Sequence, residues 1–362
     1  MKVRLYEFDF IRAISALSVI AIHTTSAYIL TNDIGYVWNQ LIRYAVPMFI
    51  IISGFLLYNS DRNKEMGYLS FLAKRLNKIL IPYFLWSAIY ALYNFRGSII
   101  HDHSLGEIVP YYLKHLLTGI DHLYFMVIIF QLYLLYPLLK WSFKKGHDKL
   151  VLLLAFLMTF YFQLASYVSN WGYLILPKKL LVYNYISFPC WIFYFALGMY
   201  LVTHMDKWKD KVTNIKLNIS LAWFICSALL IAESKITGTF ESSMKPIIIV
   251  YSIITFFLFY LVSKYIATKT FIQKIFTWIS EQSFIIYLSH ILIMRLVRAA
   301  AYRIGFTNIW DSLSGMTLFF IVTVLSTLVF TYLLSFIPFI SWLGGVSIKK
   351  QTVFNKSQEL SL

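Results

Sequence analysis

The sequence predicts an all-α polytopic membrane protein with about ten transmembrane helices. Of its 362 residues, 59% are hydrophobic and only 13% are charged, whereas soluble domains average about 45–50% apolar and about 25% charged residues. The formal net charge is +16, but the basic residues are scattered between apolar stretches rather than gathered in one domain. This scatter is typical of the loops of membrane proteins and argues against a nucleic-acid partner.

Ten stretches approach the roughly 20 apolar residues that one bilayer crossing requires. Proline and polar residues interrupt the third and the sixth; Pro82 in the third is tolerable where neighbouring helices satisfy the freed carbonyl. The connections are short, so we expect one transmembrane domain over residues 1–345 and a short cytoplasmic tail over 346–362. The expected helices span residues 8–30, 41–58, 79–97, 122–141, 150–168, 184–203, 216–234, 245–263, 279–299 and 314–340.

The distribution of Lys and Arg predicts the orientation in the membrane. With the N-terminus in the cytoplasm, 21 of the 32 Lys and Arg residues fall on the cytoplasmic side and ten on the outer side, while Arg12 stays within the first span. Cytoplasmic loops carry such an excess. We therefore expect an even number of crossings and both termini in the cytoplasm.

The first span carries three groups that a bilayer penalises: Asp9, Arg12 and His23. Asp9 and Arg12 are i, i+3 neighbours, and Arg12 and His23 differ by only about 20° around a helix, so the three share one stripe. A charge near mid-membrane costs about 2.5–3.5 kcal/mol on insertion scales, and pairing of Asp9 with Arg12 would offset part of this cost. Alternatively, the pair only fixes the helix end and His23 is a neutral core histidine.

A second polar group opens the ninth span, in "EQSFIIYLSH" (residues 281–290). Ser283, Tyr287 and His290 share one helix face, and His290 falls at a depth similar to that of His23. Two histidines at matching depth suggest a shared polar cavity. Because the unperturbed pKa of histidine is about 6.5, such a pair suits proton transfer.

The second and third spans contribute further candidate residues. Arg43 lies at the expected outer mouth, and Ser53 and Gly54 permit close approach of a ligand or of a neighbouring backbone. On the cytoplasmic side Arg75 and Lys78 are i, i+3 neighbours that suit phosphate binding. The alternatives are helix packing for the small residues and positive-inside anchoring with snorkelling for the two cations.

Together these motifs resemble the integral-membrane acyltransferase-3 family, over nearly the whole chain. The family opens with an aspartate three residues before an arginine and a histidine eleven residues later, the spacing of Asp9, Arg12 and His23. Further matches are "VPMFIIISGF", with Ile50 in place of an aromatic residue, and "RLNKILIPY", with Lys78 in place of an arginine. The remaining matches are "HLYFMVIIFQLYLLYP", with Tyr124 where tryptophan is usual, "FALGMYL" and "SFIIYLSH".

This resemblance implies a membrane-bound O-acyltransferase of a bacterial cytoplasmic membrane. It would move an acetyl or succinyl group from cytoplasmic acyl-coenzyme A, its donor substrate, to a hydroxyl of an extracytoplasmic glycan or other cell-envelope acceptor, without a tightly bound cofactor or a metal. Polysaccharide-synthesis proteins are possible partners. Arg75 and Lys78 would hold the phosphates of the coenzyme and His23 would act as general base. Asp9, Arg12, His290 and Tyr287 would complete the catalytic site, and Arg43, Ser53, Gly54 and Ser283 would line the substrate path.

Two other functions stay open from the residues alone. A transporter or flippase that exports a polysaccharide or a lipid-linked precursor would also place polar groups on bundled spans, although no inverted repeat with paired broken helices is visible. A catalytically inactive scaffold is the other alternative. Acceptor recognition is left to outer loops such as residues 96–121, where His101, Asp102 and His103 show no metal-ligand spacing.

Overall fold

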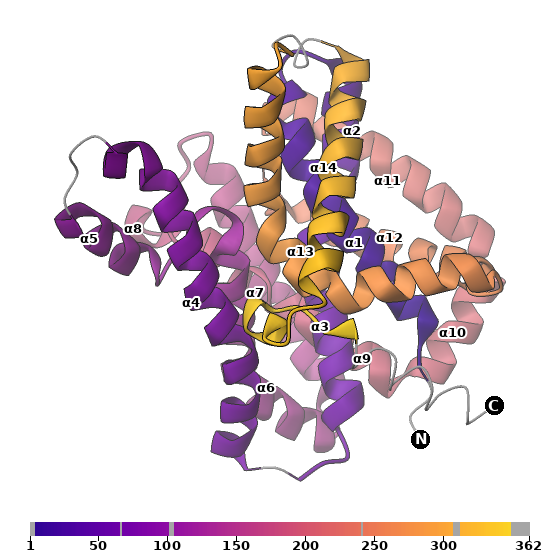
Figure 1. Cartoon of the computed structure of the whole chain (residues 1–362). Helices are drawn as coiled ribbons and strands as arrows, with labels where there is room; N and C mark the ends of the chain where they lie inside the picture. The colour runs from indigo at the N-terminus through magenta and orange to yellow at the C-terminus, as the bar shows by residue number, and fades with distance from the viewer. Residues whose placement is uncertain (1–3, 66, 101–104, 240–241, 307–311, 349–362) are drawn as a thin grey trace.

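The computed structural model describes residues 4–65, 67–100, 105–239, 242–306 and 312–348. Within these ranges the regular elements are α-helices and short 3-10 turns, with no strand, which confirms the predicted all-α fold class (Figure 1). The long helices are α1 (Tyr6–Thr25), α3 (Ala45–Asp61), α4 (Tyr68–Ile100), α6 (Tyr124–Lys144), α7 (Asp148–Ser169), α9 (Ile192–Thr203), α11 (Lys216–Thr237), α12 (Pro246–Ile266), α13 (Thr270–Arg303) and α14 (Leu313–Leu334). The shorter helices are α2 (Asp33–Leu41), α5 (Leu105–His115), α8 (Lys178–Leu181) and α10 (Met205–Asn214).

The long helices follow the order and approximate positions of the ten expected segments. In the described residues, eight segments are long and apolar enough to cross a membrane. The other two are α4, whose first half carries Lys74, Arg75 and Lys78, and α9, which is apolar but only 12 residues long. The chain is therefore a multi-pass membrane protein.

Several helices differ from their expected bounds: α4 begins at Tyr68 rather than at residue 79, and α14 ends at Leu334 rather than at residue 340. The second expected helix begins at Ala45, because residues 42–44 form a break between α2 and α3. The sixth begins with two 3-10 turns before α9. In that segment Pro189 lies in the turn Phe188–Cys190, where the missing N–H of proline interrupts a helix least. The ninth helix, α13, begins at Thr270, and in Figure 1 its first part runs across the molecule before the helix turns upward.

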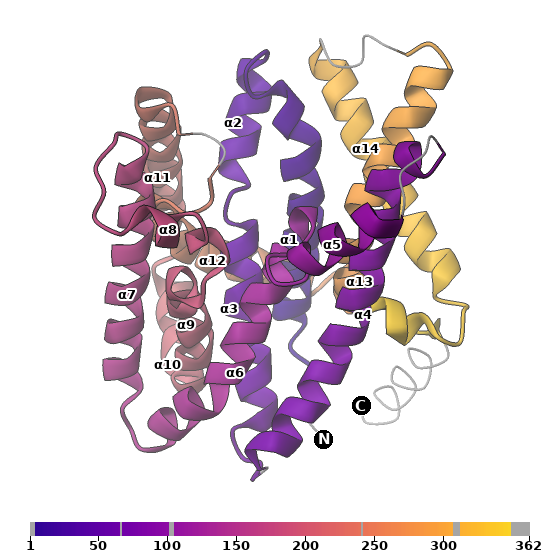
Figure 2. The same ribbon diagram turned by 90° about the vertical axis from the view of Figure 1, so that its left-hand side faces the viewer.

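The helices differ in how deeply they are buried. Of the 18 most apolar consecutive residues in each span, 67% are buried in α1 and 72% in α2–α3. The corresponding share is 22% in α7 and in α14. Figure 2 shows α1 and α3 between α7, α11 and α12 on one side and α4, α13 and α14 on the other. The outer helices α7, α11 and α14 expose large apolar side chains such as Leu157, Ile225 and Leu325, as expected for a surface that faces lipid.

The two motif glycines Gly54 and Gly198 set the distance between α3 and α9. A Cβ on Gly54 would lie 2.2 Å from the carbonyl oxygen of Phe195, and one on Gly198 would lie 2.0 Å from that of Ile51. Small residues allow such close backbone contact between membrane helices. The expectation that Gly54 lines the substrate path is therefore wrong: Gly54 is buried against α9, and the neighbouring Ser53 faces a cavity.

Candidate functional site

A cavity of about 510 Å³ lies between α1, α3, α4, α6 and α13. Along α3 its lining runs from Phe49 to Ser60, a length of about 17 Å at 1.5 Å per residue. Its inner end, at Ser60, faces the side where the cytoplasm is expected. Six residues that the sequence singled out line this inner cavity: Arg12, Ser53, Arg75, Lys78, Ser283 and Tyr287.

Three cations give the inner cavity its electrostatic character. Arg12 comes from α1, while Arg75 and Lys78 come from α4. Arg75 contacts the hydroxyl of Ser60 at 3.5 Å, and Tyr133 of α6 also lines the cavity. Within the described residues no hydrogen bond or ion pair holds Arg12 or Lys78. A cavity with two such cations is suited to an anionic ligand.

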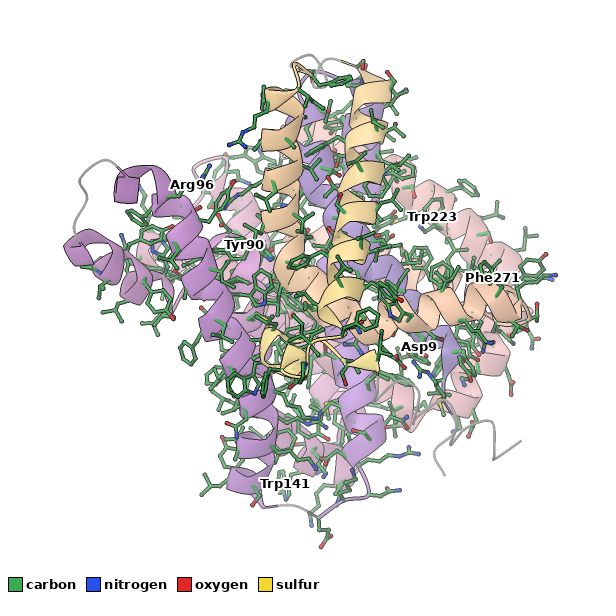
Figure 3. All side chains as sticks on the ribbon, viewed as in Figure 1. Asp9, Tyr90, Arg96, Trp141, Trp223 and Phe271 are labelled. Carbon is green, nitrogen blue, oxygen red and sulfur yellow. The ribbon has the colours of Figure 1, made fainter. Side chains whose placement is uncertain are left out.

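The prediction that Asp9 forms an ion pair with Arg12 is wrong. The Asp9 carboxylate accepts from Arg4 Nε at 2.5 Å and from the Ser280 hydroxyl at 2.8 Å, and Arg4 also bonds Glu281 at 2.6 Å. Figure 3 shows Asp9 beside the transverse part of α13. Arg4 precedes the expected first span, yet its side chain joins α1 to α13, and Arg12 faces the cavity instead.

A cluster of three histidines lies beyond the inner cavity, toward the expected outer side. His23 of α1, His290 of α13 and His122, just before α6, form this cluster. The ring centroids are 5.3 Å apart for His23 and His290, 4.6 Å for His122 and His290, and 6.3 Å for His23 and His122. The structure thus places the two predicted histidines in one site, together with a third: His122 and His290 are buried, and His23 is partly buried.

Tyr287 separates the inner cavity from the histidine cluster and contacts both. Its side chain lines the cavity, while its hydroxyl donates to the backbone carbonyl of His122. Its own carbonyl accepts from His122 Nε2 at 2.8 Å and from His290 Nδ1 at 2.6 Å. One residue of α13 therefore orients two histidines from two different elements.

The shared carbonyl fixes the tautomers of His122 and His290. A carbonyl only accepts, so His122 Nε2 and His290 Nδ1 each carry the proton. In the neutral rings, His122 Nδ1 and His290 Nε2 are then acceptors, and both are buried without a partner in the described residues. No hydrogen bond holds either ring nitrogen of His23 in that part of the chain. The cluster can accept protons from a ligand's hydroxyl group.

Charged side chains surround the cluster on the outer side. Arg43, 5% exposed, donates to Asn39, and Asn39 bonds the Ile22 carbonyl at 3.0 Å, next to His23. Arg295 pairs with Asp121 at 3.0 Å. Among the described residues Asp121 is the one non-glycine with positive φ, at 52°, so the backbone is strained directly before His122.

Arg295 also connects this turn to α4. It bonds Asn94 at 3.0 Å and lies 5.9 Å from the ring centroid of Tyr90. Tyr90, labelled in Figure 3 between α4 and α13, donates to the Leu288 carbonyl at 2.8 Å and accepts from Leu292 N at 3.1 Å. The side chains of α4 thereby hold α13 in place around Tyr287 and His290.

His122 is the site residue that sequence reasoning missed. It is the first residue of the fourth expected span and of the motif "HLYFMVIIFQLYLLYP", and the motif match does not single it out. Its signal was a polar ring at the outer boundary of a span, at the depth of the other two. By contrast, residues 101–103 of the loop proposed for acceptor recognition lie outside the described residues. Within the described residues no group of three or more His, Cys, Asp or Glu is arranged to hold a metal ion.

Comparison with known proteins identifies the family. Residues 5–336 match the model of the acyltransferase-3 family, described as "Acyltransferase domain". The chain is 30% identical over 304 residues to "Putative membrane-bound acyltransferase YfiQ" of Bacillus subtilis, covering 80% of each chain.

A second relative carries a different description. The chain is 26% identical over 330 residues to "Probable poly-beta-1,6-N-acetyl-D-glucosamine export protein" of Staphylococcus epidermidis, covering 86% of this chain and 85% of the relative. No solved structure matches. With the family model spanning nearly the whole multi-pass bundle, the chain belongs to the acyltransferase-3 family of membrane acyltransferases.

Proposed function

We propose that the protein transfers an acetyl or succinyl group from cytoplasmic acyl-coenzyme A to a hydroxyl of an extracytoplasmic glycan. One observation carries the proposal: the cation-lined inner cavity ends at Tyr287, and the same residue orients two histidines of the cluster beyond. This arrangement would bring an anionic donor next to a proton-accepting site within the bilayer. The location we propose is a bacterial cytoplasmic membrane.

The donor would enter the inner cavity with its phosphates at the cytoplasmic end. Arg75 and Lys78 lie there, and Lys78 is exposed. The pantetheine arm would extend along the apolar wall formed by residues such as Ile52, Leu56 and Ile129. Arg12, without an ion-pair partner in the described residues, would meet the polar thioester end or the carboxylate of a succinyl group.

The chemistry would then need one proton acceptor near the acyl carbon. The acceptor hydroxyl gives its proton to His23, and its oxygen attacks the thioester carbonyl. The new C–O bond forms, the C–S bond breaks, and the departing thiolate of coenzyme A takes up a proton. His290 and His122, with their acceptor nitrogens fixed, would orient the hydroxyl or relay the proton. Arg43 would stand at the outer entrance.

The glycan as acceptor is supported by the relative that is described as an exporter of poly-β-1,6-N-acetylglucosamine. That description also supports the other candidate function, export of a polysaccharide without acyl transfer. Polysaccharide-synthesis proteins would be partners under either function. Dependence on acyl-coenzyme A separates the two.

The test uses purified protein in liposomes that enclose poly-β-1,6-N-acetylglucosamine. Radiolabelled acetyl- or succinyl-coenzyme A is added to the side that carries most Lys and Arg. We expect release of coenzyme A and label on the enclosed glycan with at least one donor. Failure of every acyl donor would contradict the proposal, and glycan movement across the membrane without a donor would establish export instead.

A further inference from the structure

A second cavity, of about 210 Å³, lies at the outer ends of α7 and α11. It shares no lining residue with the inner cavity. We call it the outer cavity and define it by Ser166, Tyr167, Asn170, Tyr185, Thr239 and Lys245.

Lys245, which lines the outer cavity, forms an ion pair with Glu233, which lies behind the lining. Lys245 is 1% exposed and donates to Glu233 Oε2 at 3.0 Å. The other carboxylate oxygen accepts from the Tyr167 hydroxyl at 2.5 Å and from Thr237 at 3.3 Å. The carboxylate is thus well bonded, whereas the ammonium has three donor hydrogens and one partner within the described residues.

The chemistry of the lining favours an uncharged, hydroxyl-rich ligand. Glu233 neutralises Lys245, and no other cation lines the cavity in the part of the chain that is described, so a phosphate has no excess positive charge to bind. The rest of the lining consists of hydroxyls, the Asn170 amide, tyrosine rings and the apolar side chains of Leu181 and Met244. Trp171 packs edge-on against Tyr167 at 4.8 Å and is 46% exposed. Polar groups beside aromatic faces suit the hydroxyls and apolar faces of a sugar ring.

The outer cavity is connected to the histidine cluster through two tyrosines. Tyr185 lines the cavity, and its ring centroid is 5.6 Å from that of Tyr124. Tyr124 begins α6, two residues after His122. The rings of Tyr185 and Tyr124 therefore lie between the outer cavity and the turn that carries His122.

We propose that the outer cavity binds a sugar residue of the glycan, as a subsite next to the reacting unit. Its role as an acceptor subsite rests on the proposed function; sugar binding itself does not require acyl transfer.

The test measures binding of a β-1,6-linked N-acetylglucosamine pentasaccharide to the full-length protein in nanodiscs by calorimetry. Tyr185→Leu removes a ring from the cavity, and Tyr183→Leu is the matched control because Tyr183 is exposed, two residues away and outside the lining. We expect Tyr185→Leu to weaken binding about fivefold, as for loss of an aromatic contact, and Tyr183→Leu to leave it unchanged. Lys245→Met combined with Glu233→Gln avoids a lone buried charge and should weaken binding about tenfold.

The outcomes separate this inference from the proposed function. Pentasaccharide binding that depends on Tyr185, in a protein that transfers no acyl group, would support the subsite and overturn the acyl-transfer proposal. Glycan acylation with binding that is insensitive to Tyr185→Leu and to the double substitution would overturn the subsite alone. Inorganic phosphate that binds the cavity and displaces the sugar would also overturn it, as would an equal loss in Tyr183→Leu. Thermal unfolding of each variant distinguishes lost binding from lost folding.

Discussion

The inner cavity and the histidine cluster lie along the same helices, α1 and α13, yet they hold their polar groups in opposite ways. In the cavity, Arg12 and Lys78 have no ion-pair partner among the described residues. In the cluster, His122 and His290 are fixed by one backbone carbonyl, that of Tyr287. Unpaired cations around a cavity are suited to a charged ligand that arrives from outside. Rings with a defined tautomer are suited to proton transfer, which depends on the position of one hydrogen.

The difference between the two regions has a simple energetic basis. A cation is costly within a bilayer unless water, a ligand or a counter-ion solvates it, so the cations line a cavity that reaches the inner side. A neutral imidazole costs less to bury, but its orientation must be held by hydrogen bonds. Substitutions in the cavity should therefore change donor binding, and substitutions in the cluster should change turnover.

The largest effect is expected for His23→Ala. Loss of the general base should lower kcat about 10²–10⁴-fold and leave KM for acyl-coenzyme A nearly unchanged, because the inner cavity is intact. Steady-state transfer assays in proteoliposomes measure both constants. His147→Ala is the matched control, since His147 is exposed in the loop before α7. Full activity in His23→Ala would move the base to His290 or His122.

A smaller effect, on KM rather than on kcat, is expected for Arg75→Ala and Lys78→Ala. Each should raise KM for acyl-coenzyme A about 10- to 100-fold, as for loss of a charge-assisted hydrogen bond, with little change in kcat. Lys78→Arg should retain binding because a guanidinium also grips phosphate. Lys74→Ala, exposed and outside the lining, is the control. A fall in kcat at constant KM would contradict the assignment of donor binding to the inner cavity and of turnover to the histidine cluster.

Gly54→Ala should affect stability rather than either kinetic constant. The added methyl group would collide with the Phe195 carbonyl, and such overpacking costs about 1–3 kcal/mol in the free energy of unfolding. Thermal unfolding in detergent measures the loss. Gly67→Ala, where nothing lies within 4 Å of the new Cβ, should be neutral. An unchanged melting temperature for Gly54→Ala would contradict the close packing of α3 and α9.

The smallest effect is expected for Arg295→Ala, which touches the cluster only through the turn before His122. The pair with Asp121 is partly exposed, at 27% for each side chain, and such pairs contribute about 1 kcal/mol or less. We expect kcat to fall by no more than about fivefold, with KM for acyl-coenzyme A unchanged. Arg303→Ala, exposed at the end of α13, is the control. A loss as large as that in His23→Ala would place Arg295 among the reacting groups.

Sequence reasoning predicted more of the fold than of the site contacts. Apolar length identified all the long helices, because a bilayer crossing sets the minimum length of an apolar segment. It missed the break at residues 42–44 and the 3-10 turns before α9, which depend on local backbone geometry. Spacing placed Arg12, Ser283 and Tyr287 on polar faces, and the structure finds all three in one cavity.

The partners of individual side chains were predicted less well, since they depend on which helices meet. Helical spacing favoured Asp9 with Arg12, but Ser280 and Glu281 of α13 approach α1 and draw Asp9 and Arg4 into another network. Ser53 and Gly54 also could not be separated by sequence, although Ser53 faces the inner cavity and Gly54 packs against α9. His122 was overlooked for a similar reason: a ring at a span boundary becomes part of a site only when α13 lies against it.

By itself the sequence determined the membrane class, the order of the helices and which charged and polar residues within the spans are candidates for a function. It did so because hydropathy and spacing are local properties, set by bilayer thickness and by 3.6 residues per turn. Only the tertiary structure decided that α13 crosses α1, and with that crossing came the Tyr287 carbonyl that both His122 and His290 bond. Contacts between distant segments follow from the packing of whole helices, so no single segment specifies them.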